Sequence, residues 1–158
     1  MNSSLPSVQR VHASCVAVEG RGALITGRSG AGKSQLAMKM IGLGAELIAD
    51  DQVELHFDPD RIALRPPVAL AGLIEVRGMG IVRLAHAMSA ELVLVVDMDT
   101  AHEARFPHLR NTYFTNLWFP LIAGRGRPNL AYEVMACLRS GLDPLFLDPE
   151  DMGNGPVD

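Results

Sequence analysis

Cysteine is scarce in this chain of 158 residues, which has two, Cys15 and Cys137, and the two are far apart. Because no C-x-x-C spacing is present, the sequence shows no zinc-binding motif and no disulfide framework. The spacing favours two buried thiols in a reducing compartment.

Positive charge and long apolar runs are also lacking. The formal net charge is −4 at pH 7, whereas a nucleic-acid-binding surface is basic, so we expect no nucleic acid as a main partner. No apolar run approaches the roughly 18 residues of a membrane span, and the N-terminus has no long apolar core of a signal peptide. We therefore expect a cytoplasmic protein with no membrane partner, and a basic protein partner is compatible with the charge.

The length and composition are those of an ordinary folded domain. Apolar residues make up 48% of the chain and charged residues 20%, which suits one domain with a hydrophobic core. We expect a single catalytic domain over residues 1–142 and a disordered acidic tail at 143–158.

A glycine-rich loop, GRSGAGKS at residues 27–34, matches the phosphate-loop pattern G-x-x-x-x-G-K-[ST]. Glycines let backbone N–H groups wrap a phosphate, and the N-terminus of the next helix adds further donors. Lys33 would bring positive charge to the terminal phosphates, and Ser34 would offer a hydroxyl to Mg²⁺. The predicted nucleotide-binding residues, with ATP as the nucleotide, are Gly27, Arg28, Ser29, Gly30, Ala31, Gly32, Lys33 and Ser34.

The flanking sequence supports this interpretation of the loop. The apolar run at residues 23–26 predicts a strand that enters the loop. After the loop, Leu36, Ala37, Met40 and Ile41 recur at helical spacing, and the glycines at 42 and 44 would end that helix.

The rest of the chain predicts more strands than helices. We expect strands at 11–18, 45–49, 52–57 and 61–65, a fully buried strand at 91–97, an irregular segment at 98–116, and a short apolar patch at 117–122 broken by Pro120. A second helix would run over 129–140, with Asn129 as its N-cap. This pattern predicts an α/β fold of α+β character, a P-loop kinase core in which one P-loop helix packs on a mixed, largely antiparallel sheet.

Acidic residues follow the strand after the predicted P-loop helix. Asp50 and Asp51 end that strand, at the kind of sheet edge where ligands bind. Because neighbouring side chains on an extended backbone point to opposite sides, we expect different roles, with one carboxylate near the loop and the other structural. Phosphoryl transfer needs a carboxylate to complete a metal site or to accept a proton, and Glu75, beside the Arg77–Gly80 turn, is a further candidate.

Four elements together resemble a known family: His12, the loop at 27–34, Ala-Asp-Asp at 49–51, and Leu-Ile-Glu-Val-Arg-Gly-Met-Gly-Ile at 73–81. They are similar to the catalytic domain of bacterial HPr kinase/phosphorylase, in its short, catalytic-domain-only form of alphaproteobacterial type. The resemblance implies a fold related to phosphoenolpyruvate carboxykinase. It also implies an ATP- and Mg²⁺-dependent kinase that phosphorylates a serine of HPr, the phosphocarrier of a regulatory phosphotransferase system.

The resemblance also implies roles for individual residues. Asp51 would accept the proton of the serine hydroxyl, Lys33 would hold the transferred phosphate, and His12 would lie near the phosphates or Asp51. Ser34 and Glu75 would place the metal, with Asp50 as a further metal ligand. Arg105 would be the catalytic arginine.

Several alternatives stay open at this stage. Full-length family members also catalyse phosphorolysis of phosphoserine-HPr, but the loop at 123–128 differs from the family's sequence there. A homo-oligomer is a further possibility that the sequence does not decide. The same P-loop scaffold could instead serve a small-molecule kinase or a non-catalytic nucleotide sensor.

Overall fold

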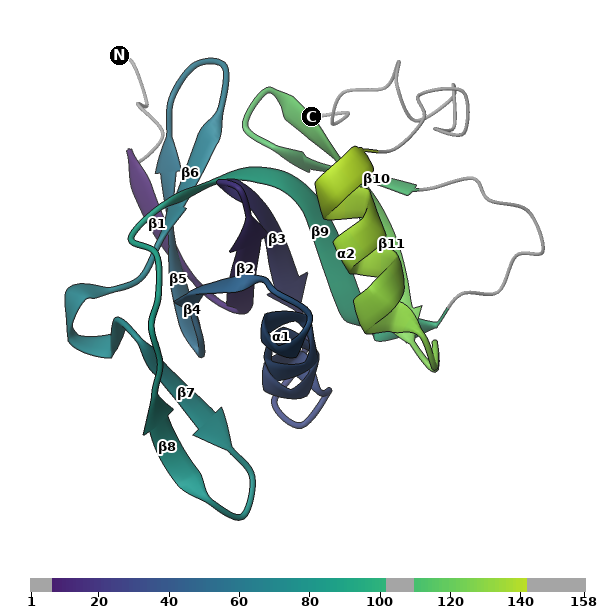
Figure 1. The fold of residues 1–158 in the computed structure, drawn as a ribbon. Coiled ribbons are helices and arrows are strands. Elements are labelled where there is room, and N and C mark those ends of the chain that lie inside the picture. The colour runs from purple at the N-terminus through teal and green to yellow at the C-terminus, as the bar shows by residue number, and fades with distance from the viewer. Residues whose placement is uncertain (1–6, 102–109, 142–158) are drawn as a thin grey trace.

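The computed structural model of the chain describes residues 7–101 and 110–141. Within these residues, a nine-stranded sheet and a two-stranded hairpin accompany two α-helices (Figure 1). The strands of the large sheet are β1 (Val8–His12), β2 (Ser14–Val18), β3 (Arg21–Thr26), β4 (Glu46–Ala49), β5 (Gln52–Phe57), β6 (Ile62–Arg65), β9 (Ala90–Ala101), β10 (Arg110–Phe114) and β11 (Leu117–Arg125). The hairpin consists of β7 (Leu73–Val76) and β8 (Gly80–Arg83), and the helices are α1 (Lys33–Gly42) and α2 (Leu130–Ser140), with a 3-10 turn at Val68–Leu70.

The large sheet is mixed, as predicted. Its strand order is β1-β5-β6-β9-β3-β2-β4, with β11 paired to β9 and β10 paired to β11. The strands β3, β9 and β11 run parallel to one another, and every other described pair in the sheet is antiparallel. The parallel strands therefore end at one common edge, and the phosphate loop begins there.

The central strand β9 is buried on both faces, which confirms the prediction from its apolar run. A β-bulge adds a residue at Val93, because Gly22 pairs with Leu92 and the next residue, Ala23, pairs with Leu94. A bulge reverses the alternation of side chains. As a result, Leu92 packs on one face of the sheet and Leu94 on the other.

Two hydrophobic cores lie on the two faces of the central strands. Both helices pack on one face, where Met40 of α1 and Val134 of α2 are fully buried, and Figure 1 shows them side by side there. The other face is closed by β5 and β6, through residues such as Leu55 and Leu64. Since burial of each such side chain stabilises the fold by about 1.5–3 kcal/mol, the helix bearing the loop is held firmly.

The β7–β8 hairpin leaves the large sheet and projects beside α1 (Figure 1). Its base is anchored by Ile74, which is buried in the helix-side core. Its outer part carries exposed apolar side chains, Met79 (79% exposed) and Ile81 (72% exposed).

Some predicted elements were wrong in extent. The strand expected at 11–18 is divided at Ala13 into β1 and β2, and the irregular segment expected at 98–116 contains the end of β9 and the whole of β10. The patch expected to break at Pro120 is the continuous strand β11. Pro120 pairs with Asn111 of β10 but precedes the ladder of β11 with β9, which begins at Leu121. Its missing N–H therefore removes no hydrogen bond to β9.

The second helix lies where the sequence predicts it, but its cap differs. Asn129 occupies the N-cap position of α2, yet its side chain makes no capping hydrogen bond. The helix ends at Gly141, whose φ of +77° suits glycine. The predicted tail at 143–158 and Arg105 lie outside the described residues.

Candidate active site

The phosphate loop joins β3 to α1, and two of its N–H groups have acceptors: that of Arg28 donates to the Asp99 carboxylate, at 3.1 and 3.2 Å, and that of Ala31 donates to the carbonyl oxygen of Arg28, at 3.1 Å. Gly27 has a φ of +143°, and a Cβ added there would lie 3.1 Å from the Cβ of Met98, so a side chain at this position would be strained. Gly32 caps α1 without a side-chain hydrogen bond, and the first turn of the helix contains no acidic residue. The N–H groups of a first helical turn lack partners within the helix, so this end of α1 can receive an anion.

Lys33 lies across the inside of the loop. Its residue is only 7% exposed, and its Nζ donates hydrogen bonds to the carbonyl oxygens of Gly27, at 2.7 Å, and Arg28, at 2.9 Å. Among the described residues, no carboxylate lies within ion-pair distance of this ammonium group. A buried positive charge balanced only by carbonyl dipoles favours a negatively charged ligand beside it.

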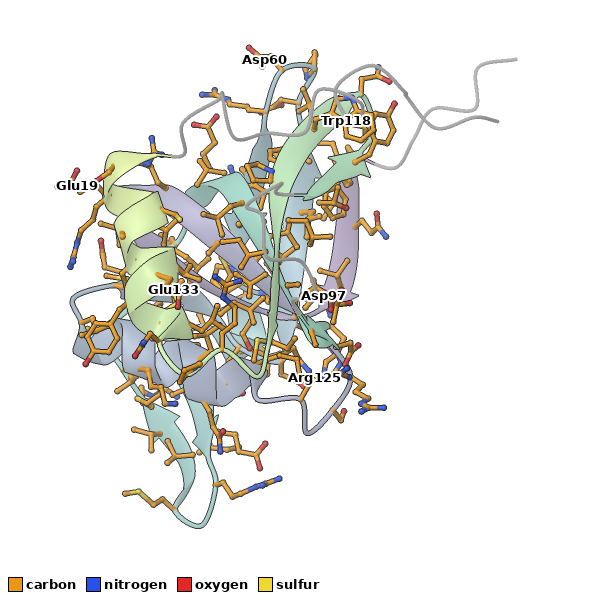
Figure 2. All side chains as sticks on the ribbon, turned by 90° about the vertical axis from the view of Figure 1, so that its right-hand side faces the viewer. Glu19, Asp60, Asp97, Trp118, Arg125 and Glu133 are labelled. Carbon is orange, nitrogen blue, oxygen red and sulfur yellow. The ribbon has the colours of Figure 1, made fainter. Side chains whose placement is uncertain are left out.

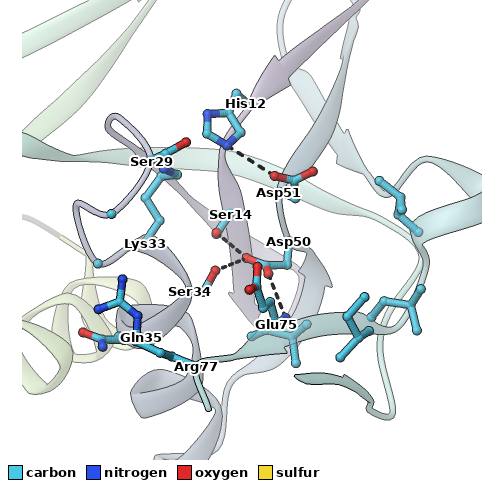
Figure 3. Close-up of a pocket in the computed structure, with 16 residues that line it drawn as sticks. His12, Ser14, Ser29, Lys33, Ser34, Gln35, Asp50, Asp51, Glu75 and Arg77 are labelled. Carbon is cyan, nitrogen blue, oxygen red and sulfur yellow. Dashed lines mark hydrogen bonds and ion pairs between the residues drawn. The ribbon is translucent and has the colours of Figure 1, made fainter. Parts of the chain in front are cut away.

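The Asp50 carboxylate faces the loop from the end of β4. It is 5% exposed, and its Oδ1 accepts hydrogen bonds from the hydroxyls of Ser14, at 2.6 Å, and Ser34, at 2.8 Å (Figure 3). Its Oδ2 accepts a third from the backbone N–H of Glu75, at 3.3 Å. This one carboxylate therefore links β2, the phosphate loop and the hairpin.

Asp51 faces the same cleft as Asp50, so the expectation that the two acids point to opposite sides was wrong. The reason is a tight turn, because the φ of Asp51 is +68° and the N–H of Gln52 donates to the carbonyl oxygen of Asp50 at 2.8 Å. Such a conformation is costly for a residue other than glycine and is concentrated at functional sites.

His12 is the partner of Asp51. Its Nε2 lies 3.3 Å from Asp51 Oδ1, and the side chains are 47% and 67% exposed. The backbone is also joined here, since the N–H of Ala13 donates to the carbonyl oxygen of Asp51 at 3.2 Å. The break between β1 and β2 therefore brings the imidazole to the strained aspartate (Figure 3).

These groups line one open cleft of about 400 Å³. The predicted residues that it brings together are His12, Ser29, Gly30, Gly32, Lys33, Ser34, Asp50, Asp51 and Glu75. Gly27, Arg28 and Ala31 belong to the loop but do not line this cleft. The geometry thus places the predicted acids directly across from the loop.

Sequence reasoning missed three polar residues of the cleft, Ser14, Gln35 and Arg77. The signal for Ser14 was a hydroxyl within an otherwise apolar strand, two residues after His12. Arg77 and Gln35 come from the hairpin and from α1, and Figure 3 draws both in the cleft. Only the folded chain brings these two elements together.

The donor atoms of the cleft suit a hard cation. Asp50, Glu75 and Ser34 offer carboxylate and hydroxyl oxygens. Within residues 7–101 and 110–141, no group of three or more His, Cys, Asp or Glu side chains is arranged to hold a metal without other ligands. Mg²⁺ fits such a site, because it is bound by one or two carboxylates together with substrate phosphates and water.

The arrangement of strand, glycine loop, helix and acidic strand end defines a P-loop nucleotide-binding domain on a mixed α/β sheet. No helix in the part of the chain that the structure describes has the length and apolar character to cross a membrane.

Comparison with known proteins narrows this class to one family. The family model of the HPr Serine kinase C-terminal domain matches residues 3–100. The chain therefore belongs to the family of HPr serine kinase C-terminal domains, which confirms the resemblance found in the sequence.

Among similar curated proteins, the HPr kinase/phosphorylase of Geobacillus kaustophilus is 37% identical over 107 residues, covering 63% of this chain and 34% of that protein. The protein of the same name from Shouchella clausii is 39% identical over 94 residues, covering 59% of this chain and 30% of that protein. The chain thus spans about a third of the length of these relatives. The structure of the Hpr(Ser) kinase/phosphatase from Coxiella burnetii shares the fold, with a TM-score of 0.71 and 24% identity over 83% of this chain and 94% of that chain.

Proposed function

We propose that this chain transfers the terminal phosphoryl group of ATP to a serine hydroxyl of an HPr-type phosphocarrier protein in the cytoplasm. The single observation that carries the proposal is the position of Asp51, which faces the phosphate loop across one cleft with His12 beside it. The family and the names of its relatives support HPr as the acceptor.

The proposed reaction needs positioning more than covalent chemistry. The serine oxygen forms a bond to the terminal phosphorus of ATP while the bond from that phosphorus to the bridging oxygen of ADP breaks. Asp51 accepts the serine proton, and His12 holds the carboxylate in place. Lys33 and the loop amides bind the phosphate oxygens.

Asp50, Ser34 and Glu75 are the residues that would hold Mg²⁺ in this proposal. The ion would neutralise charge on the bound phosphates. Since Ser14 and Ser34 both donate to Asp50 Oδ1, they orient that carboxylate toward the loop.

A catalytic arginine is a further requirement, because charge develops on the transferred group. The sequence predicts Arg105, which lies outside the described residues. Arg77 lines the cleft and makes no ion pair within the described ranges. It is therefore a second candidate for this role, alongside Arg105.

The shape of the cleft favours a protein acceptor over a small molecule. Asp51 is 67% exposed, and the exposed Ile81 lies on the rim. A small-molecule kinase needs a closed acceptor pocket that keeps water from the reacting groups. An exposed carboxylate is instead shielded when a large partner covers it.

The test is phosphoryl transfer with purified HPr, labelled ATP and Mg²⁺, with HPr whose acceptor serine is changed to alanine as the control. The proposal predicts label on serine of HPr and none on the control. Label on metabolites but not on HPr would instead support a small-molecule kinase.

The reverse reaction, phosphorolysis of phosphoserine-HPr, is a separate part of the proposal. If the chain also catalyses phosphorolysis, inorganic phosphate attacks phosphoserine, the serine hydroxyl regains a proton from Asp51, and pyrophosphate leaves. Release of pyrophosphate from phospho-HPr and inorganic phosphate measures this directly. Transfer to HPr without pyrophosphate release would restrict the proposal to the kinase direction.

A further inference from the structure

A second groove, of about 680 Å³, flanks the phosphate loop and is not part of the site described above. It shares Gly32 and Gln35 with the acidic cleft. From there it runs along α1 to the turn between β11 and α2. The two hollows therefore adjoin each other at Gly32 and Gln35.

The floor of the groove is apolar and tightly packed. It includes Leu36, Met98 and Leu130. A Cβ added to Gly124 would lie 2.9 Å from both Met98 Sδ and Leu130 Cδ2, so the glycine is what allows these two side chains to meet. This floor is apolar and closely packed, and an aromatic ring could lie against it.

One wall of the groove presents a fixed guanidinium group. Glu133 Oε2 accepts hydrogen bonds from Arg127 Nε, at 2.9 Å, and Nη2, at 2.7 Å. The Arg127 side chain is 32% exposed, so part of the guanidinium plane is accessible while the pairing with Glu133 fixes its orientation. A guanidinium held in this way stacks well on an aromatic ring.

We propose that this groove binds the nucleoside part, base and ribose, of the nucleotide whose phosphates occupy the loop. The inference rests on the proposed function. If the terminal phosphate faces Asp51 in the cleft, the nucleoside extends from the loop in a direction away from that cleft. The groove adjoins the loop at Gly32 and Gln35 and can receive it there. Its volume is within the usual range for small-molecule sites.

Arg127 provides the test, because the same segment contains a matched control. Arg125 is an exposed arginine two residues away that does not line the groove. Figure 2 shows Arg125 at the end of β11 and Glu133, the partner of Arg127, on α2. Arg127→Ala and Arg125→Ala remove the same charge from one short segment, and only the first removes the stacking surface.

The experiment measures the dissociation constants of MgATP and of magnesium tripolyphosphate by titration calorimetry, on the wild type and both variants. Tripolyphosphate has no base or ribose, so it reports the loop alone. We expect Arg127→Ala to weaken ATP binding about fivefold to tenfold and tripolyphosphate binding by less than about twofold. Arg125→Ala should change both ligands equally and slightly.

Two results would overturn the inference while leaving the proposed function intact: unchanged ATP binding in Arg127→Ala, or equal weakening of ATP and tripolyphosphate. If wild type binds neither ligand, both proposals fail. A second readout avoids dependence on one variant. With ¹³C-labelled methionine methyl groups, the Met98 resonance should shift more with MgATP than with magnesium tripolyphosphate, which reaches Met98 only from the side of Gly32 in the loop. Equal shifts with the two ligands, or an unmoved signal with MgATP, would contradict the inference.

Discussion

The Ser14 hydroxyl donates a 2.6 Å hydrogen bond to Asp50 Oδ1 beneath the phosphate loop. Ser14 is fully buried and Asp50 is 5% exposed, so solvent weakens this contact little. A hydrogen bond to a charged group contributes about 1.5–3 kcal/mol. Ser14 therefore holds in place the carboxylate proposed to bind the metal.

Ser14→Ala should lower the free energy of unfolding by about 1–2 kcal/mol, because Asp50 keeps two of its three partners. It should also raise the Mg²⁺ concentration needed for half-maximal transfer. Urea denaturation and a magnesium titration measure the two effects. Ser89→Ala is the control, since Ser89 is exposed, and equal behaviour of the two variants would contradict this role.

His12→Asn should reduce transfer to HPr about tenfold with little change in stability, because both side chains of its pair are partly exposed. His56→Asn is the matched control, as His56 Nε2 lies 3.2 Å from Glu54 away from the cleft. Equal loss of activity in both variants would remove His12 from the proposed site.

The same substitution, glycine to alanine, should have opposite effects on stability at two positions, Gly22 and Gly42. A Cβ at Gly22 would lie 2.9 Å from Leu64 Cδ1 and 3.1 Å from the Glu91 carbonyl oxygen, so Gly22→Ala should destabilise the fold by about 1–3 kcal/mol. A Cβ at Gly42 in α1 would meet nothing within 4 Å, so Gly42→Ala should stabilise by about 0.5–1 kcal/mol. Thermal denaturation compares the two variants. A change in stability of the same sign in both would contradict the close packing described around Gly22 in β3.

Burial raises the pKa of the Cys15 thiol well above its ordinary value, which predicts a pH dependence of stability. The unfolded chain loses this proton near pH 8.5 whereas the folded chain keeps it. The folded state therefore loses stability relative to the unfolded state as pH rises above about 8.5. Cys15→Ala should flatten this slope in denaturation measured between pH 7 and 10, and an identical slope in the variant would contradict the burial of Cys15.

The sequence predicted the elements whose signals are local. The phosphate loop has fixed residue types, β9 a continuous apolar run, and α2 a clear periodicity, and each was found at its predicted place. These signals depend on backbone geometry and burial, both of which act over a few neighbouring residues.

What the sequence missed depends on the folded chain. The positive φ of Asp51 cannot be inferred from its residue type, so both acids were expected to point apart. The contact of Ser14 with Asp50 spans 36 residues of sequence, and Pro120 is accommodated in β11 because the ladder with β9 begins only at Leu121. The groove beside the loop is formed by α1, β9 and the turn before α2, a juxtaposition without a local signal.

Asp51 as the acceptor of the serine proton is the central element of the proposed mechanism. The most direct measurement compares Asp51→Asn with wild type in two quantities, the phosphoserine formed on HPr and the dissociation constant of MgATP. The control is Asp58→Asn, because Asp58 is an exposed aspartate outside the cleft. Asp51→Asn should lower transfer by about 10²–10⁴-fold with ATP binding within about threefold of wild type, while the control stays active. Wild-type transfer by Asp51→Asn would contradict the proposed mechanism, and absence of transfer by the wild type itself would favour a non-catalytic nucleotide sensor.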